Sequence, residues 1–189
     1  MMTAALLLLA AACAGGGAGD DTGSPSSSTI GTTSSTDAGT GASATVTPPG
    51  TQLTFGQAAF VPLQVEGVRG VIAVAVVSVT AGLPQDRTVL RLANGNPYYV
   101  TMMIQNTGSP PDLGSYEPDL VGVQSDGIQA SAVNEPDDFP PCEDHGPTAL
   151  ALGASFVTCE AYVAAAGTTM AAVEFIPGPG IDPITWKPA

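Results

Sequence analysis

Basic residues are scarce in this sequence, which has four Lys and Arg against 17 Asp and Glu and a formal net charge of −13. Affinity for nucleic acid depends on Lys and Arg side chains that neutralise phosphates. Basic clusters also hold proteins against anionic lipid headgroups. The charge balance therefore excludes nucleic acid as a partner and disfavours direct binding to a headgroup surface.

Residues that carry out catalysis are scarce as well. The single histidine, His145, lies in the loop sequence CEDHG, and no serine has the G-x-S-x-G surroundings of a hydrolase nucleophile. Aromatic residues make up 5% of the chain, too few to line a groove for glycoside hydrolysis. We therefore expect no enzymatic activity and no cofactor, and we interpret His145 as a solvent-facing loop residue.

Charged residues amount to only 11%, so the helix-favouring Lys, Glu and Arg are few, whereas Gly (23) and Pro (17) are abundant. No window predicts an amphipathic helix with caps. From about Thr51, large aliphatic residues recur at strand spacing. Tight turns are predicted at Asn94-Gly95, Ser125-Asp126-Gly127 and Ala166-Gly167. About seven or eight strands in residues 51–189 predict an all-β antiparallel sandwich.

The strand patterns also assign side chains to faces. Residues 71–80 are apolar on both faces, as in a central strand. In residues 98–106, one face carries Tyr98, Val100, Met102 and Ile104, and the other carries Tyr99, Thr101, Met103 and Gln105. The predicted inward positions are Val157, Cys159, Ala161 and Val163 in residues 155–163, and Ala171, Val173 and Phe175 in residues 170–176. Near the C-terminus, Ile184 and Trp186 share one face.

An apolar run, residues 4–12, directly precedes Cys13. At roughly 1.5 Å per residue it is too short to cross a ~30 Å hydrocarbon core. It has the length of a signal-peptide apolar region that ends in small residues. Residues 9–13, LAAAC, resemble the lipobox of bacterial lipoproteins. The resemblance implies cleavage before Cys13 and diacylglycerol on its sulfur; the alternative is a secretory signal without a lipid.

The residues that follow are dominated by Gly, Ser and Thr as far as Gly50. Such a composition buries too little apolar surface to offset its chain entropy. We therefore predict a signal peptide (1–12), a lipidated Cys13 with a flexible linker (13–50), and a folded domain (51–189). O-glycosylation of the Ser and Thr clusters is an alternative role for the linker.

Cys142 and Cys159 remain once Cys13 is assigned to lipid, and the count becomes even. Outside the cytosol such a pair is expected to be oxidised. The bridge would close a loop worth about 3 kcal/mol in the chain-entropy model. We therefore predict a disulfide, the alternative being two free thiols; with the cysteines so assigned, a His–Cys zinc site is excluded.

An acidic loop, residues 135–145, is the best candidate for a metal site. Its carboxylates belong to Glu135, Asp137, Asp138, Glu143 and Asp144. Clustered carboxylates can bind Ca²⁺, but EF-hand spacing is absent and three prolines restrict their convergence. The favoured interpretation is a solvated acidic loop, with no metal bound.

The methionines suggest a second metal, since Met and His are ligands of copper carriers. The candidates are Met102, Met103 and Met170 with His145. Adjacent Met102 and Met103 face opposite sides of one strand and so do not readily share an ion. Packing is the better explanation of these residues.

The stretch PYYVTMMIQNTG, followed by SDG and the pair Cys142/Cys159, resembles the immunoglobulin-like domains of actinobacterial exported lipoproteins. These are similar in layout to the mycobacterial immunoprotective extracellular protein family. The resemblance covers about residues 52–186, with an Asn-x-Gly turn at Asn106-Thr107-Gly108 and an Asp-Gly turn at Asp126-Gly127. It implies an immunoglobulin-like sandwich outside the membrane and carries over no catalytic residues.

These observations predict a non-enzymatic lipoprotein at the extracytoplasmic face of the cell membrane. Its N-terminal lipid would hold it to the membrane, and its domain would bind an envelope protein or a cell-wall component. The alternative is an exported calcium-binding protein or enzyme that uses the acidic loop and His145.

Overall fold

The computed structural model describes residues 44–189 except 66–67, 110–115, 137–138, 144–145 and 147–148. The predicted signal peptide, Cys13 and most of the predicted linker lie outside these residues, so lipidation stays a prediction. The described elements are β1 (Gln52–Thr54), β2 (Ala58–Val65), β3 (Val68–Ala81), α1 (Asp86–Val89), β4 (Asn96–Ser109), β5 (Leu120–Gln124), β6 (Ser131–Val133), β7 (Ser155–Ala164), β8 (Met170–Phe175) and β9 (Ile184–Lys187). No helix among the described residues is long and apolar enough to cross a membrane.

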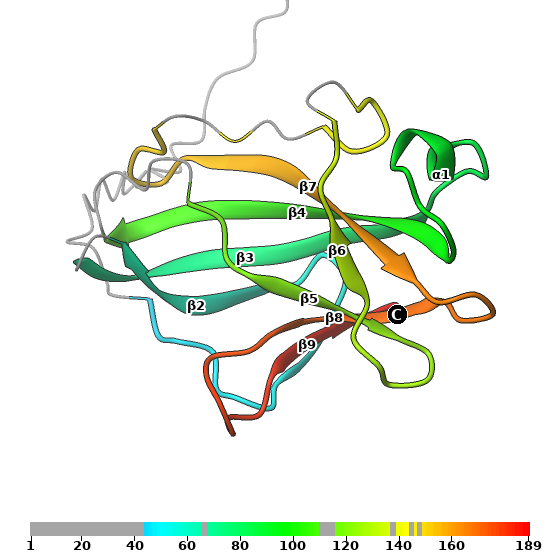
Figure 1. The fold of residues 1–189 in the computed structure, drawn as a ribbon. Coiled ribbons are helices and arrows are strands. Elements are labelled where there is room, and N and C mark those ends of the chain that lie inside the picture. The colour runs from blue at the N-terminus through cyan, green and yellow to red at the C-terminus, as the bar shows by residue number, and fades with distance from the viewer. Residues whose placement is uncertain (1–43, 66–67, 110–115, 137–138, 144–145, 147–148) are drawn as a thin grey trace, which may run out of the picture. The chain divides into compact units, whose positions relative to one another are not determined.

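The strands form two sheets that pack face to face (Figure 1). A four-stranded sheet has the order β1-β9-β8-β5, and a five-stranded sheet has the order β2-β3-β4-β7-β6. All neighbours are antiparallel except β1 and β9, which run parallel. The predicted all-β sandwich is confirmed. The described residues contain nine strands, compared with the seven or eight predicted. Strands β1 and β6 have three residues each and are too short to show an alternating pattern in the sequence.

The main core lies between the sheets and consists of side chains from both. Its largest fully buried residues include Trp186, Tyr162, Ile72, Met102, Ile104 and Ile184. The Trp186 indole N–H donates a hydrogen bond to the Gln57 carbonyl at 2.9 Å, so its polar atom is satisfied. The predicted central position of residues 71–80 and the predicted shared faces in β4 and β9 are confirmed.

The inward face predicted for residues 155–163 is wrong. Tyr162 and Thr158 are buried on the core side of β7, whereas Val157 is 49% exposed. Cys159 and Ala161 belong to a second cluster on the outer face. Alternation indicated the wrong face because the core side of β7 carries polar Thr158 and Glu160, whereas the second cluster covers Cys159 and Ala161 on the outer face.

The predicted Asn-x-Gly turn lies inside β4, where it forms a bulge. Ile72 of β3 pairs with Asn106, but the next residue, Val71, pairs with Ser109, which leaves Thr107 and Gly108 as extra residues. Gly108 has φ +132°, a conformation that favours glycine. The Asn106 carboxamide accepts the Gly108 N–H at 3.0 Å, a local bond that suits a bulge as well as a turn.

The connection between β3 and β4 is longer than a tight hairpin. It contains the four-residue helix α1 before it reaches the predicted Asn94-Gly95 turn. Gly95 has φ +85°, and a Cβ atom there would lie 2.5 Å from the Ala164 carbonyl oxygen of β7. Glycine is therefore required at this position by close packing as well as by backbone conformation.

Candidate functional site

A second apolar cluster, here called the outer cluster, lies on the outer face of the five-stranded sheet. Its buried members are Leu90, Tyr99, Phe139, Cys142 and Ala161, with Leu92, Val133 and Cys159 packed against them. Tyr99 and Ala161 belong to strands β4 and β7. The other three buried members come from two connections: the arginine loop, residues 82–95, and the acidic loop, residues 135–145. The outer cluster therefore holds both loops on the sheet (Figure 1).

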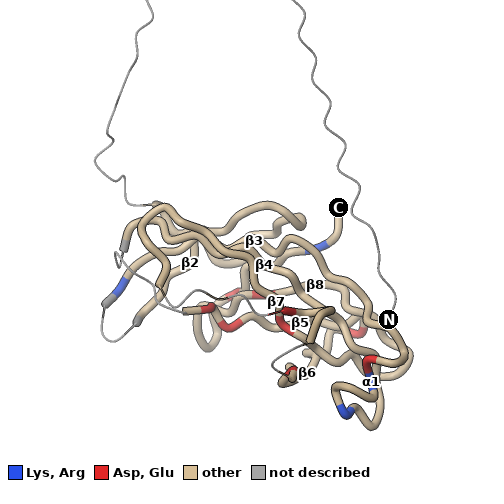
Figure 2. Tube along the Cα trace, turned by 90° about the horizontal axis from the view of Figure 1, so that it is seen from above, with Lys and Arg blue, Asp and Glu red and all other residues tan. Residues whose placement is uncertain are grey.

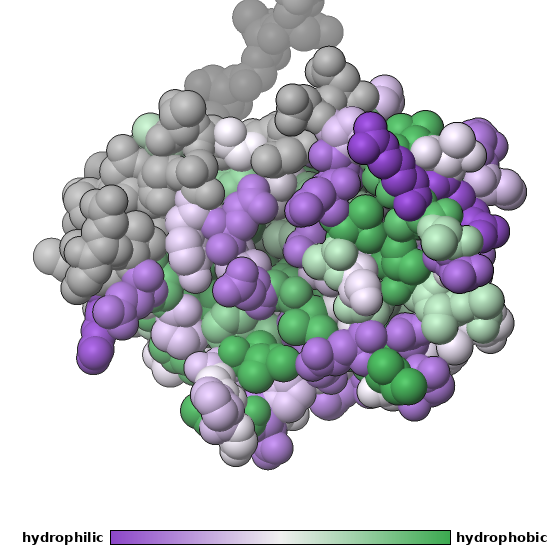
Figure 3. Space-filling model, viewed as in Figure 1, coloured by the Kyte–Doolittle hydropathy of each residue, from purple (hydrophilic) through white to green (hydrophobic). Residues whose placement is uncertain are grey.

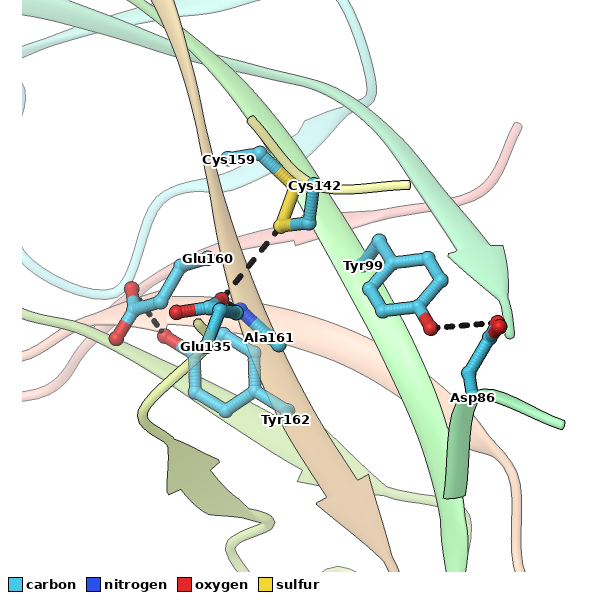
Figure 4. Close-up of a disulfide and its surroundings, with 8 residues drawn as sticks. All are labelled: Asp86, Tyr99, Glu135, Cys142, Cys159, Glu160, Ala161 and Tyr162. Carbon is cyan, nitrogen blue, oxygen red and sulfur yellow. Dashed lines mark hydrogen bonds between the residues drawn. A yellow bond between two sulfur atoms is a disulfide. The ribbon is translucent and has the colours of Figure 1, made fainter. Parts of the chain in front are cut away.

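A disulfide joins the acidic loop to β7. Cys142 and Cys159 are bonded, with their Cα atoms 5.2 Å apart, and they are the pair that the cysteine count predicts. Cys159 can reach the acidic loop because its side chain lies on the outer face of β7, away from the main core (Figure 4). Without this bond, Phe139 and Cys142 would have to stay on the sheet through packing alone.

Glu135, one of the candidate metal ligands of the acidic loop, fixes the beginning of that loop. Its carboxylate accepts the backbone N–H of Ala161 at 2.5 Å, next to the end of β6. The same oxygen lies 3.6 Å from Cys142 Sγ, a contact without a hydrogen bond because a disulfide sulfur carries no hydrogen (Figure 4). Glu135 therefore has a structural role.

Tyr99 connects the acidic loop to the arginine loop. Its ring meets the Phe139 ring edge-on, with centroids 5.6 Å apart. Its hydroxyl donates a hydrogen bond to Asp86 Oδ2 at 2.7 Å, and the Leu83 N–H donates to the same oxygen at 2.7 Å. Burial and the adjacent Asp86 carboxylate raise the pKa of Tyr99, so the phenol stays protonated and remains a donor.

The arginine loop presents cationic and apolar side chains together. It contains Arg87 and Arg91, two of the four basic residues of the chain. Leu83 and Val89 are 57% and 50% exposed. Figure 2 shows basic positions at and beside α1, which also carries the acidic position of Asp86. In Figure 3, hydrophobic and strongly hydrophilic atoms meet at the corner that carries α1.

A shallow hollow opens beside α1. It has a volume of about 250 Å³ and is lined by Pro84, Arg87, Thr88 and Leu92. Sequence reasoning did not single out this loop. The available signal was the spacing of Arg87 and Arg91 in a chain with so few basic residues, but nothing in the sequence showed that both lie on a loop fixed to the sheet.

On the core side of β7, Glu160 and Tyr162 form a second polar group. The Tyr162 hydroxyl lies 2.8 Å from the Leu120 carbonyl and 2.7 Å from Glu160 Oε2 (Figure 4). One phenol hydrogen cannot satisfy two acceptors fully, whereas a protonated Glu160 could donate to the phenol oxygen. Burial raises the pKa of Glu160 and outweighs the lowering by Tyr162; Glu135, Glu117 and Asp119 raise it further. The hydrogen bond from Tyr162 to Leu120 connects β7 to β5 across the two sheets.

The remaining candidate ligands do not assemble among the described residues. Glu143 is exposed, and Asp137, Asp138, Asp144 and His145 lie outside the described part of the chain. Within that part, no group of three His, Cys, Asp or Glu side chains is placed to hold a metal ion.

The methionines occupy separate places. Met102 is buried in the main core, Met103 is 39% exposed on the opposite face of β4, and Met170 packs against the main core. The predicted opposite orientation of Met102 and Met103 is therefore confirmed. Packing accounts for Met102 and Met170.

The chain matches no protein-family model and no curated protein. Among solved structures, it is similar to a secreted protein from Mycobacterium tuberculosis, MPT63, with a TM-score of 0.53 and 14% sequence identity. The similar region covers 76% of this chain and 100% of that chain. At this identity the likeness shows a shared fold: the chain has the β-sandwich architecture of a secreted mycobacterial protein.

Proposed function

We propose that this protein is an exported, membrane-anchored lipoprotein whose sandwich is a non-enzymatic binding module of the cell envelope. The observation that carries the proposal is the outer cluster, through which the disulfide and Tyr99 fix two long loops on a rigid sheet. Loops held by a scaffold commonly carry binding residues. Loops ordered before binding lose less conformational entropy when a partner arrives.

Export is supported by the disulfide, since such bonds persist in oxidising compartments. The shared fold with a secreted protein is consistent with it. The apolar run before Cys13 supports a signal peptide and a lipid anchor. A diacylglyceryl group supplies two acyl chains, enough for stable attachment to a membrane.

The anchor is tested by the variant Cys13→Ala, expressed in a bacterium that processes lipoproteins. We expect the variant to leave the membrane fraction, and we expect an inhibitor of lipoprotein signal peptidase to block maturation of the native chain. Cys142→Ala, which removes a different cysteine, is the control and should stay with the membrane. Membrane retention of Cys13→Ala equal to that of the native chain would refute lipidation.

Binding is tested by placing a photoreactive amino acid at one exposed position at a time in intact cells. Val89, Val157 and Ile181 are 50%, 49% and 44% exposed and lie in α1, in β7 and in the connection between β8 and β9. A binding module should give a covalent adduct from at least one position, with the others as matched controls for surface exposure. Absence of adducts from every position, in cells that export the protein normally, would contradict the proposal.

A further inference from the structure

We propose that the arginine loop is a docking surface for a polypeptide segment that presents a carboxylate beside an aliphatic side chain. This inference rests on the proposed binding function and specifies the surface and the chemistry of the partner. It follows from the charge of the loop, its exposed apolar side chains and the hollow beside α1.

The charge of the arginine loop favours an anionic partner. Within the described residues, neither Arg87 nor Arg91 forms an ion pair. The carboxylate nearest in sequence, that of Asp86, is buried and already accepts hydrogen bonds from Leu83 and Tyr99. The guanidinium groups are thus left for an external acceptor, and guanidinium binds carboxylates well through paired hydrogen bonds.

The apolar side chains favour a partner that also carries a hydrocarbon group. Leu83 and Val89 are at least half exposed, close in sequence to the hollow lined by Pro84, Arg87, Thr88 and Leu92. At about 250 Å³, the hollow is smaller than the roughly 300–1,000 Å³ of a small-molecule site. It suits one anchoring side chain of a larger partner better than a whole small ligand.

The backbone conformation at Arg91 follows from the end of α1. Arg91 has φ +54°, and it is the non-glycine residue with positive φ among the described residues. Glycine adopts this conformation at lower cost, and long side chains seldom occupy it. The Arg91 N–H donates to the Thr88 carbonyl at 3.2 Å and the Leu92 N–H donates to the Arg87 carbonyl at 2.8 Å, so Arg91 is the left-handed residue that ends α1 in a Schellman motif. The loop therefore keeps a guanidinium group at a position where the backbone alone would favour glycine.

A lipid surface and a second copy of this chain fit less well. The net charge of −13 repels anionic headgroups, and it also repels another copy carrying the same charge. A polypeptide segment with a carboxylate and an aliphatic side chain can contact the two arginines and the exposed Leu83 and Val89. Such a segment carries few negative charges, so the domain repels it less than it repels an extended anionic surface.

The test uses the full exported chain with its disulfide intact and a fluorescent peptide that alternates leucine and aspartate, followed by fluorescence anisotropy. A matched peptide has asparagine in place of aspartate. We expect the aspartate peptide to bind and the asparagine peptide to bind about tenfold more weakly or not at all. Equal binding of the two peptides, or binding of neither, would overturn the inference.

Variants locate the binding on the loop. Arg87→Gln and Arg91→Gly should each weaken binding of the aspartate peptide by about tenfold, because each removes a guanidinium contact. Lys187→Gln removes the same charge from exposed Lys187 at the end of β9 and should leave binding within about twofold. Equal losses in all three variants would show a general charge effect and would contradict docking at the loop.

Two further measurements examine the competing partners. Binding to phosphatidylglycerol vesicles that Arg87→Gln abolishes would assign the loop to lipid. Self-association in sedimentation that Arg87→Gln abolishes would assign it to a second copy. Either result would overturn this inference while leaving the proposed binding function intact, since that function fails only if no exposed position forms an adduct in cells.

Discussion

The main core and the outer cluster differ in how they are built. The main core gathers side chains from strands of both sheets, and alternation along those strands places them there. The outer cluster has five buried residues, of which Leu90, Phe139 and Cys142 belong to loops. It depends on a disulfide and on the hydrogen bonds of Asp86. The comparison teaches that the scaffold and the presented loops are stabilised by separate means.

This separation has a functional consequence. A binding surface can change its loops without disturbing the sheets when the loops have their own attachment. The arginine loop is attached through Leu90 and through the bond between Asp86 and Tyr99. Substitutions in the main core should therefore unfold the domain, whereas substitutions in the outer cluster should loosen the loops and leave the sandwich folded.

The largest effect is predicted for Trp186→Ala. Trp186 is fully buried between the sheets, so the substitution removes a large packed side chain and the donor to Gln57. We expect a loss of about 3–5 kcal/mol in the free energy of unfolding, measured by urea titration. Ile181→Ala, at a residue 44% exposed, is the control and should change stability by less than about 1 kcal/mol. Equal losses in the two variants would contradict a core centred between the sheets.

The next effect is predicted for the double variant Cys142→Ala/Cys159→Ala. It removes a bond that spans 17 residues, and the chain-entropy model gives a loss of about 3 kcal/mol. The far-ultraviolet circular dichroism of the sandwich should stay unchanged at low denaturant because the main core is intact. A loss of the β spectrum there would show that the two clusters are not separate.

A smaller effect is predicted for Tyr99→Phe, which keeps the ring on Phe139 but removes the donor to buried Asp86. We expect a loss of about 1–3 kcal/mol in stability. Tyr98→Phe is the matched control, since within the described residues the Tyr98 hydroxyl has no hydrogen-bond partner. Equal stability of the two variants in urea titration would show that the hydrogen bond from Tyr99 to Asp86 does not stabilise the folded domain.

The smallest effect is a dependence on pH. Burial raises the pKa of Glu160 above its ordinary value of 4.5, so the folded state binds this proton more tightly than the unfolded state does. The contribution of Glu160 to stability is therefore fully present below that ordinary value and is lost as the pH rises through the folded-state pKa. Glu160→Gln, whose amide can donate to Tyr162 at any pH, should be more stable than the native chain at neutral pH. Thermal unfolding at acidic and neutral pH measures this, and a variant less stable at neutral pH would contradict it.

The architecture could be predicted from the sequence where one physical rule dominates. Alternation placed Val100, Met102 and Ile104 on one side of β4, and glycine marked the turns at Gly127 and Gly167. The pairing of Cys142 with Cys159 followed from the count of cysteines. These predictions needed only local spacing or a count.

The candidate site was harder to predict because it depends on contacts between distant segments. The inward face of β7 was predicted wrongly, because the outer cluster covers Cys159 and Ala161 whereas polar Thr158 and Glu160 lie on the core side. Glu135 was interpreted as part of a solvated acidic loop, but its carboxylate accepts a hydrogen bond from the backbone of Ala161. The arginine loop was missed because no local pattern shows that Leu90 and the bond between Asp86 and Tyr99 attach it to the sheet.

The separation of the two clusters is tested most directly by hydrogen exchange on the full chain, measured by mass spectrometry with the disulfide intact and after its reduction. Reduction should speed exchange in both the acidic loop and the arginine loop, because Phe139 and Tyr99 transmit the loss of Cys142. Amides of β3 and β4 in the main core should keep their protection. Faster exchange throughout the sandwich, or in the acidic loop alone, would contradict the account.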